Sequence, residues 1–144
     1  MRVDFYQLSR DPVEAALPLL ARATLNAGER MLVVSADPAQ LDRIGEGLWA
    51  LPDSFLANGR AGTAHDGRQP VLLSESCEPA NGARFLALAD GRWREEATAF
   101  ARTFLLFDDS TVEAARGVWK QLRTREDTER NFWKQEGGRW IKAG

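Results

Sequence analysis

The sequence is short of the side chains that most often carry out catalysis or hold metals. It has one cysteine, Cys77, and one histidine, His65. A single cysteine excludes an internal disulfide and fits a reducing compartment. A zinc centre needs several Cys, His or carboxylate ligands, and a catalytic triad needs a histidine beside a nucleophile, whereas His65 stands in a polar segment without such a motif. We therefore expect no metal site and no catalytic residue.

The glycine patterns of nucleotide-binding proteins are missing as well. Gly59 and Gly62 are not followed by the Gly-Lys-Ser/Thr of a phosphate loop, and residues 9–13 after the first predicted strand contain no glycine. Long hydrophobic runs are also absent, since apolar runs such as residues 31–34 and 104–107 are far too short to span a bilayer. With no signal-peptide pattern at the N-terminus, we expect a cytoplasmic protein without a cofactor or membrane contact.

The charge of the chain is unevenly distributed. Its 144 residues are 44% hydrophobic and 28% charged, as in an ordinary globular domain, so we expect a single domain over 1–144. The net charge is −2, but residues 112–144 hold 8 basic and 5 acidic side chains. This excess is too small for a general nucleic-acid surface, but it is enough to attract an acidic peptide.

Short apolar runs alternate with helical patterns along the chain. This alternation predicts an α/β protein of three layers, α/β/α, in which helices cover both faces of a mostly parallel five-stranded sheet. The predicted strands are 3–8, 30–35, 70–73, 84–88 and 102–107, and the predicted helices are 13–25, 38–48, 92–101 and 110–125. After this core of residues 1–125, two aromatic runs flank residues 136–138 and predict a C-terminal β-hairpin extension within 126–144.

The predicted helix 110–125 is the best candidate for a site. Ser110 and Glu113 have the spacing of a capping box. Trp119 falls between the apolar arc of this helix and a basic stripe formed by Arg116, Lys120 and Arg123. Basic residues near a helix end also complement its dipole, which is the structural alternative. The functional interpretation is a groove for a ligand that is both acidic and apolar, such as a peptide ending in a carboxylate or a phosphate with a flat ring.

A second candidate surface follows the second predicted helix. Trp49, Pro52, Phe55 and Leu56 lie in an aromatic, proline-containing segment. These side chains either fold back to close one end of the core or anchor a protein–protein contact.

Several motifs, taken in order along almost the whole chain, resemble the chi subunit family of bacterial DNA polymerase III. They are residues 3–8 (VDFYQL), 28–33 (GERMLV), Leu48-Trp49 followed by 53–56 (DSFL), 69–73 (QPVLL), Asn81-Gly82 and 116–120 (RGVWK). The resemblance implies a nucleotide-binding-like fold without a nucleotide, and a noncatalytic subunit that bridges two partners. These are the psi subunit of the clamp-loader assembly and the acidic, apolar-ended tail of single-stranded-DNA-binding protein, so that DNA is contacted only indirectly.

The resemblance also assigns roles to the two candidate surfaces. The psi-facing surface of the family corresponds to Trp49, Pro52 and Phe55, with Leu56 beside them. The tail site of the family corresponds to the four residues already singled out on the last helix, Arg116, Trp119, Lys120 and Arg123. Some family members end soon after this helix, so residues 132–142 would here either extend or cover the tail site.

Two other functions remain open from the sequence. One is a small nucleotide- or phosphate-binding enzyme that uses the carboxyl edge of the sheet and a loop residue such as Asp108 or His65. The other is a direct single-stranded nucleic-acid binder that stacks bases on Trp119, Trp133 and Trp140.

Overall fold

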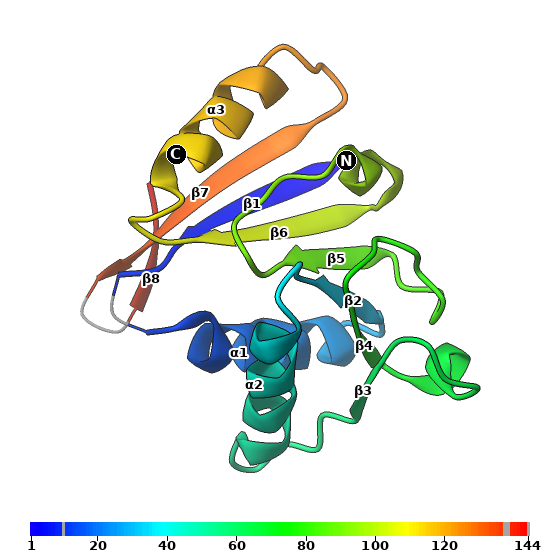
Figure 1. Ribbon diagram of the computed structural model, residues 1–144. Helices are drawn as coiled ribbons and strands as arrows, with labels where there is room; N and C mark the ends of the chain where they lie inside the picture. The colour runs from blue at the N-terminus through cyan, green and yellow to red at the C-terminus, as the bar shows by residue number, and fades with distance from the viewer. Residues whose placement is uncertain (10, 137–138, 144) are drawn as a thin grey trace.

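An eight-stranded sheet runs through the centre of the molecule (Figure 1). The structure is a computed structural model, which describes residues 1–9, 11–136 and 139–143. The strand order is β3-β4-β2-β5-β6-β1-β7-β8. Every neighbouring pair is parallel except β7 and β8, which are antiparallel. The chain is therefore a mixed α/β protein with a mostly parallel sheet, as the sequence predicts.

The bounds of the elements are as follows. The strands are β1 (Arg2–Gln7), β2 (Met31–Val34), β3 (Asn58–Arg60), β4 (Val71–Ser74), β5 (Phe85–Leu88), β6 (Arg102–Phe107), β7 (Glu129–Glu136) and β8 (Arg139–Lys142). The α-helices are α1 (Val13–Asn26), α2 (Pro38–Ala50) and α3 (Val112–Leu122), and the 3₁₀ turns are η1 (Asp66–Arg68) and η2 (Glu95–Ala99).

All five predicted strands are present, but a sheet of only five strands is wrong. The five are β1, β2, β4, β5 and β6, whose side chains are almost entirely buried because the sheet is covered on both faces. Strand β3 lies at one edge of the sheet and is not among the predicted strands. Its residues, 58–60 (NGR), are only half-buried and carry no apolar pattern. Strands β7 and β8 extend the other edge, and the predicted turn at 137–138 lies outside the described residues.

The helices lie on both faces of the sheet, each over its own cluster of buried side chains. Helices α1 and α2 cover one face, and α3 covers the other (Figure 1). The predicted boundaries of α1 and α2 are confirmed to within two residues. Asp37 marks the start of α2, where its carboxylate accepts a hydrogen bond of 3.0 Å from the Ala39 amide, and Gly28, with a φ of 81°, follows the end of α1. No helix of the described ranges is long and apolar enough to cross a bilayer.

The sequence prediction is wrong for the segment 92–101, which contains only the 3₁₀ turn η2. Its apolar side chains need only one turn to be buried, since Ala97 and Phe100 both enter the core. The residues before η2 are held outside a helix because the Asp90 carboxylate accepts hydrogen bonds from the Arg92 amide at 3.2 Å and from the Arg94 guanidinium at 2.9 Å.

The predicted capping box of α3 is also wrong. The helix begins at Val112 after Thr111, without a side-chain hydrogen bond at the cap. Ser110 instead donates hydrogen bonds from both its amide and its hydroxyl to the Asp108 carboxylate, and Glu113 forms an ion pair with Arg116 at 3.0 Å. A local turn around Asp108 therefore takes the place of the expected box.

Candidate functional site

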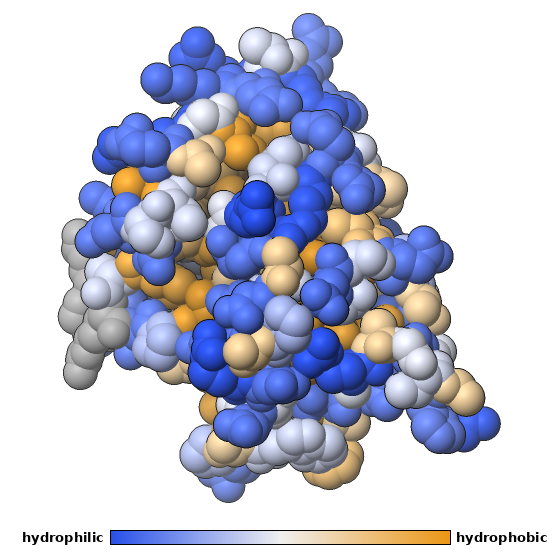
Figure 2. Space-filling model, viewed as in Figure 1, coloured by the Kyte–Doolittle hydropathy of each residue, from blue (hydrophilic) through white to orange (hydrophobic). Residues whose placement is uncertain are grey.

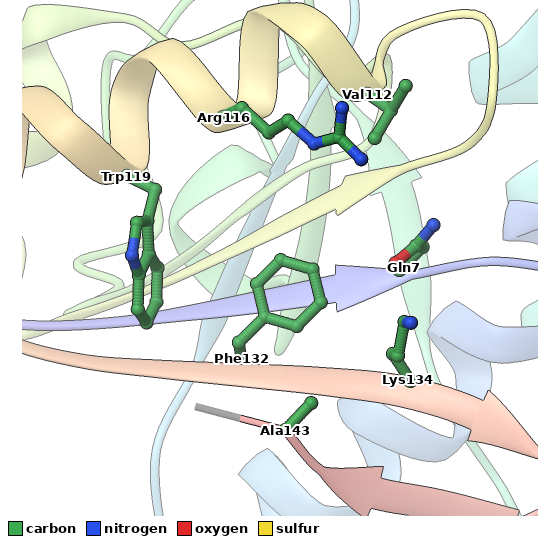
Figure 3. Close-up of a pocket in the computed structure, with 7 residues that line it drawn as sticks. All are labelled: Gln7, Val112, Arg116, Trp119, Phe132, Lys134 and Ala143. Carbon is green, nitrogen blue, oxygen red and sulfur yellow. The ribbon is translucent and has the colours of Figure 1, made fainter.

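A pocket of about 350 Å³ opens between α3 and β7 (Figure 3). We call it the α3–β7 pocket, and it is lined by Gln7 of β1, by Val112, Arg116 and Trp119 of α3, by Phe132 and Lys134 of β7, and by Ala143. Figure 2 shows apolar atoms exposed on an otherwise largely hydrophilic face, below the start of α3 and beside β8.

Two regular repeats place these side chains together. Val112, Arg116 and Trp119 are spaced i, i+4 and i+7, which puts them on one stripe of α3. Strand β7 runs parallel to β1, with Gln7 opposite Lys134. Because side chains alternate along a strand, Phe132 and Lys134 both face the helix.

The inner part of the pocket is aromatic. The Trp119 ring packs edge-on against Phe5, with 5.1 Å between ring centroids, and against Phe132, with 5.8 Å. Phe5 and Phe132 stack at 6.4 Å across β1 and β7. Trp119 is half-buried by these contacts, so its remaining surface faces the pocket as a flat apolar wall.

Arg130 of β7 holds the Trp119 indole from another direction. Its guanidinium lies 4.2 Å from the centre of the indole ring, and its Nη1 donates a hydrogen bond of 2.7 Å to the Trp119 carbonyl. This carbonyl belongs to the last turn of α3, where free carbonyls accumulate. Arg130 therefore fixes both the ring and the helix end.

Positive charge surrounds the aromatic surface. The exposed Arg116 guanidinium reaches over the pocket from α3, and Lys134 rises from β7 on the side away from Trp119 (Figure 3). Arg116 also pairs with Glu113, but both side chains are exposed, so the pair is weak and easily exchanged for another anion. The pocket offers an apolar surface beside two cations, which suits a ligand that carries both an apolar group and a carboxylate.

Only part of the site predicted on α3 is brought together. Arg116 and Trp119 line the pocket, whereas Lys120 of α3 and Arg123, the residue that follows α3, are exposed and are not among its lining residues. Gln7 was not predicted from the sequence. For residues 132–142 the sequence predicts only that they extend or cover the tail site, without singling out Phe132 or Lys134. The alternating aromatic run of 132–142 was the available signal, and in the structure its strand β7 forms a wall of the pocket.

The second candidate surface is an exposed aromatic pair at the end of α2. Trp49 is 53% exposed and Phe55 is 79% exposed, with their rings edge-to-face at 5.5 Å. Pro52 is also exposed. Leu56, which the sequence groups with them, is only 3% exposed and belongs to the core beneath α1 and α2, so it is not a surface residue.

A carboxylate lies at the place in the sheet where α/β enzymes bind nucleotides. Strands β2 and β5 are neighbours whose connections lead to opposite sides of the sheet, which is where a nucleotide-binding crevice forms. Here Asp90, after β5, accepts a hydrogen bond of 2.9 Å from the Ala36 amide, after β2. Burial opposes ionisation of Asp90, but its hydrogen bonds from Arg94 and backbone amides hold the pKa of the carboxyl below its usual value. A protein carboxylate thus lies at this point of the sheet edge, where its negative charge opposes the binding of a phosphate group.

The tryptophans do not form a common stacking platform. Trp119 packs on the α3 face, whereas Trp133 and Trp140 pack around Tyr6 on the α1–α2 face, at 6.1 and 4.9 Å between ring centroids. The sheet separates these two groups. The structure therefore gives no support to base stacking across all three indoles.

Comparisons with known proteins give one informative match. A search of curated protein sequences found no match. The model of the family described as DNA polymerase III chi subunit, HolC, matches residues 1–128 and so spans β1 to α3. Since this match covers most of the chain, the protein belongs to the DNA polymerase III chi subunit family.

Proposed function

We propose that this protein links the clamp-loader assembly of DNA polymerase III to single-stranded-DNA-binding protein, and that it binds the acidic tail of that protein in the α3–β7 pocket. Membership of the chi subunit family supports a noncatalytic role in the polymerase III holoenzyme during DNA replication. The link to the two partners is the part that we infer.

The observation that carries this proposal is the composition of the pocket. Trp119 and Phe132 offer an aromatic surface, and Arg116 stands beside it with an exposed guanidinium. An apolar side chain at the end of a peptide would pack on the rings, while its terminal carboxylate would pair with Arg116. Both parts of the ligand would then be bound within one pocket.

Lys120 and Arg123 have a different part in the proposed site. Both are exposed outside the pocket lining, so an ion pair with either contributes only about 0 to 1 kcal/mol. Charges in such positions mainly raise the association rate of an oppositely charged partner. We therefore assign to them the attraction of the acidic tail rather than its direct binding.

For the second partner we propose the exposed surface formed by Trp49, Pro52 and Phe55. Two large aromatic side chains in mutual contact at the end of a helix have the character of interface anchors. The partner proposed for this surface is the psi subunit or an equivalent component of the clamp loader.

The test is calorimetric titration of the whole protein with a synthetic peptide matching the tail of the organism's single-stranded-DNA-binding protein. We expect binding that weakens as salt is raised, because exposed charges are screened. Arg116→Gln should weaken binding about tenfold, whereas the matched variant Lys120→Gln should change it by less than about twofold. Amidation of the terminal carboxylate should weaken binding of the wild type to a similar degree.

The proposal fails if the folded wild-type protein does not bind the peptide. Equal losses of peptide affinity in Arg116→Gln and Lys120→Gln would mean that the peptide binds along the exposed basic residues of α3 instead of in the pocket. Circular dichroism of each variant establishes that the loss of binding is not a loss of folding, since both side chains are exposed.

A further inference from the structure

The α3–β7 pocket continues into a second, polar pocket. The second pocket has a volume of about 240 Å³ and is lined by Gln7, Ser9, Lys134 and Gln135. Gln7 and Lys134 also line the α3–β7 pocket. They are partners in the pairing of β1 with β7, so the two pockets adjoin at this cross-strand pair, and we call the two together the groove.

We propose that the polar pocket is a second subsite, which receives the acidic residues that precede the apolar end of a bound peptide, and that Lys134 is the residue that selects for them. This inference rests on the proposed binding of an acidic tail in the α3–β7 pocket. It adds a binding determinant that lies on β7, after the last residue of the family match at 128.

The chemistry of the groove changes along its length. At one end the lining is aromatic, with Trp119 and Phe132, and Figure 3 shows Gln7 and Lys134 on the far side of Phe132 from Trp119. Beyond this pair the lining residues that the structure describes, Ser9 and Gln135, are polar. A ligand that fits both ends must therefore be apolar in one part and hydrophilic in the next.

The charge of the junction specifies the sign of the hydrophilic part. Neither pocket has an aspartate or glutamate among the described residues that line it, and Lys134 is exposed. A neighbouring polar group is held in place, because the Ser9 hydroxyl donates to the Gln135 carbonyl at 3.0 Å. The Gln135 side chain alternates with that of Lys134 and lies on the other face of the sheet, where it donates to the Asp11 carboxylate at 2.6 Å. The ammonium of Lys134 is thus presented on a fixed polar surface, where a carboxylate is the complementary group.

The spacing of side chains along β7 determines which residue of the peptide lies next to Lys134. Phe132 and Lys134 are alternate residues of a strand, about 6.7 Å apart at 3.3 to 3.4 Å per residue. An extended peptide that follows β7 presents its own alternate side chains at the same interval. A peptide side chain packed on Phe132 is therefore followed, two residues closer to the amino end, by a side chain above Lys134.

The experiment compares two synthetic peptides on the whole protein by calorimetry. The short peptide carries only the apolar end and its terminal carboxylate, and the long peptide adds the preceding aspartates. The wild type should bind the long peptide about fivefold more tightly, and Lys134→Gln should lose about threefold to fivefold of affinity for the long peptide alone. Lys142→Gln is the matched control, because Lys142 pairs with Trp133 of β7 and so faces the other side of the sheet.

A third peptide locates the contact. Replacing the aspartate two residues before the packed apolar side chain by asparagine should remove most of the effect of Lys134→Gln, since the two changes would break the same ion pair. Equal effects of Lys134→Gln on both peptides, or an equal loss in Lys142→Gln, would overturn the inference while leaving tail binding intact. If the wild type binds neither peptide, the proposed function fails and the inference fails with it.

Discussion

The guanidinium of Arg130 stacks on the indole of Trp119 at 4.2 Å and also donates a hydrogen bond to the Trp119 carbonyl at 2.7 Å. One side chain of β7 thereby restrains both the ring that walls the α3–β7 pocket and the end of the helix that carries it. Preorganisation of this kind lowers the entropy cost of binding a ligand.

We expect Arg130→Ala to destabilise the protein and to weaken peptide binding. The lost cation–π contact and charged hydrogen bond should lower the free energy of unfolding by about 1 to 3 kcal/mol. Urea denaturation measures this change, and Arg123→Ala, which removes an exposed arginine at the residue after α3, serves as the control. Equal unfolding free energies for the two variants would show that the stacking contact contributes nothing.

The buried carboxylate of Asp4 should be essential to the stability of the sheet. Its side chain is 0% exposed, and it accepts hydrogen bonds from Arg102 at 2.6 Å and from the Trp133 indole at 3.2 Å. Asp4→Asn leaves the half-buried Arg102 without its counter-ion, so the free energy of unfolding should fall by about 3 kcal/mol. The exposed pair of Asp42 with Arg60 is the control, since Asp42→Asn should cost less than about 1 kcal/mol. Similar losses in urea denaturation would contradict this ranking.

The stability contributed by Asp90 should depend on pH. Although burial of the carboxyl opposes its ionisation, hydrogen bonds from Arg94 and from the Ala36 amide hold its pKa below the ordinary value of 3.8. A lowered pKa in the folded state stabilises the protein above the unfolded pKa, and this contribution is lost as the pH falls through the folded pKa.

Asp90→Asn should therefore lower the free energy of unfolding by about 1 to 2 kcal/mol at pH 7. The difference from the wild type should shrink below about pH 4, where the wild-type carboxyl also takes up a proton. Urea denaturation at a series of pH values measures both. A difference that stays constant into acid would show that the charge of Asp90 is not the stabilising feature.

Alanine variants of Trp49 and Phe55 should affect partner binding much more than stability. Because both side chains are mainly exposed, each variant should change the free energy of unfolding by less than about 1 kcal/mol. Affinity for the psi subunit, measured by titration calorimetry, should fall more than about tenfold if the rings are interface anchors. Ile141→Ala, which removes another exposed apolar side chain on β8, should leave that affinity unchanged.

The five inner strands and the three α-helices could be predicted because their signals are local. The run 31–34 is apolar at every position since both faces of β2 are buried, and the spacing in α3 identifies one buried side of a helix. Strand β3 escaped prediction because Asn58–Arg60 carries no apolar pattern and depends on its pairing with β4. The cap of α3 was missed because Asp108 competes for the same hydrogen bonds.

The candidate site could be predicted only on the helix side. The helical spacing of Arg116 and Trp119 is visible in the sequence, but the opposite wall is set by pairing β1 with β7, across more than a hundred residues. The alternating pattern of β7 indicates a strand without specifying its neighbour. The sequence likewise does not distinguish the buried Leu56 from the exposed Phe55 before it, because the burial of Leu56 depends on core contacts with distant residues.

The sheet separates the two candidate surfaces, and this separation affects how two partners could be bound. The α3–β7 pocket lies beside β7, near one edge of the sheet, whereas the Trp49–Phe55 pair lies at the end of α2, over the opposite face (Figure 1). If both surfaces bind partners as proposed, a partner at one surface leaves the other accessible, and the protein would act as a spacer between the two partners. Two partners held by the same molecule would then be kept at a high effective concentration, so that a partner released from one surface would rebind before the two partners separate.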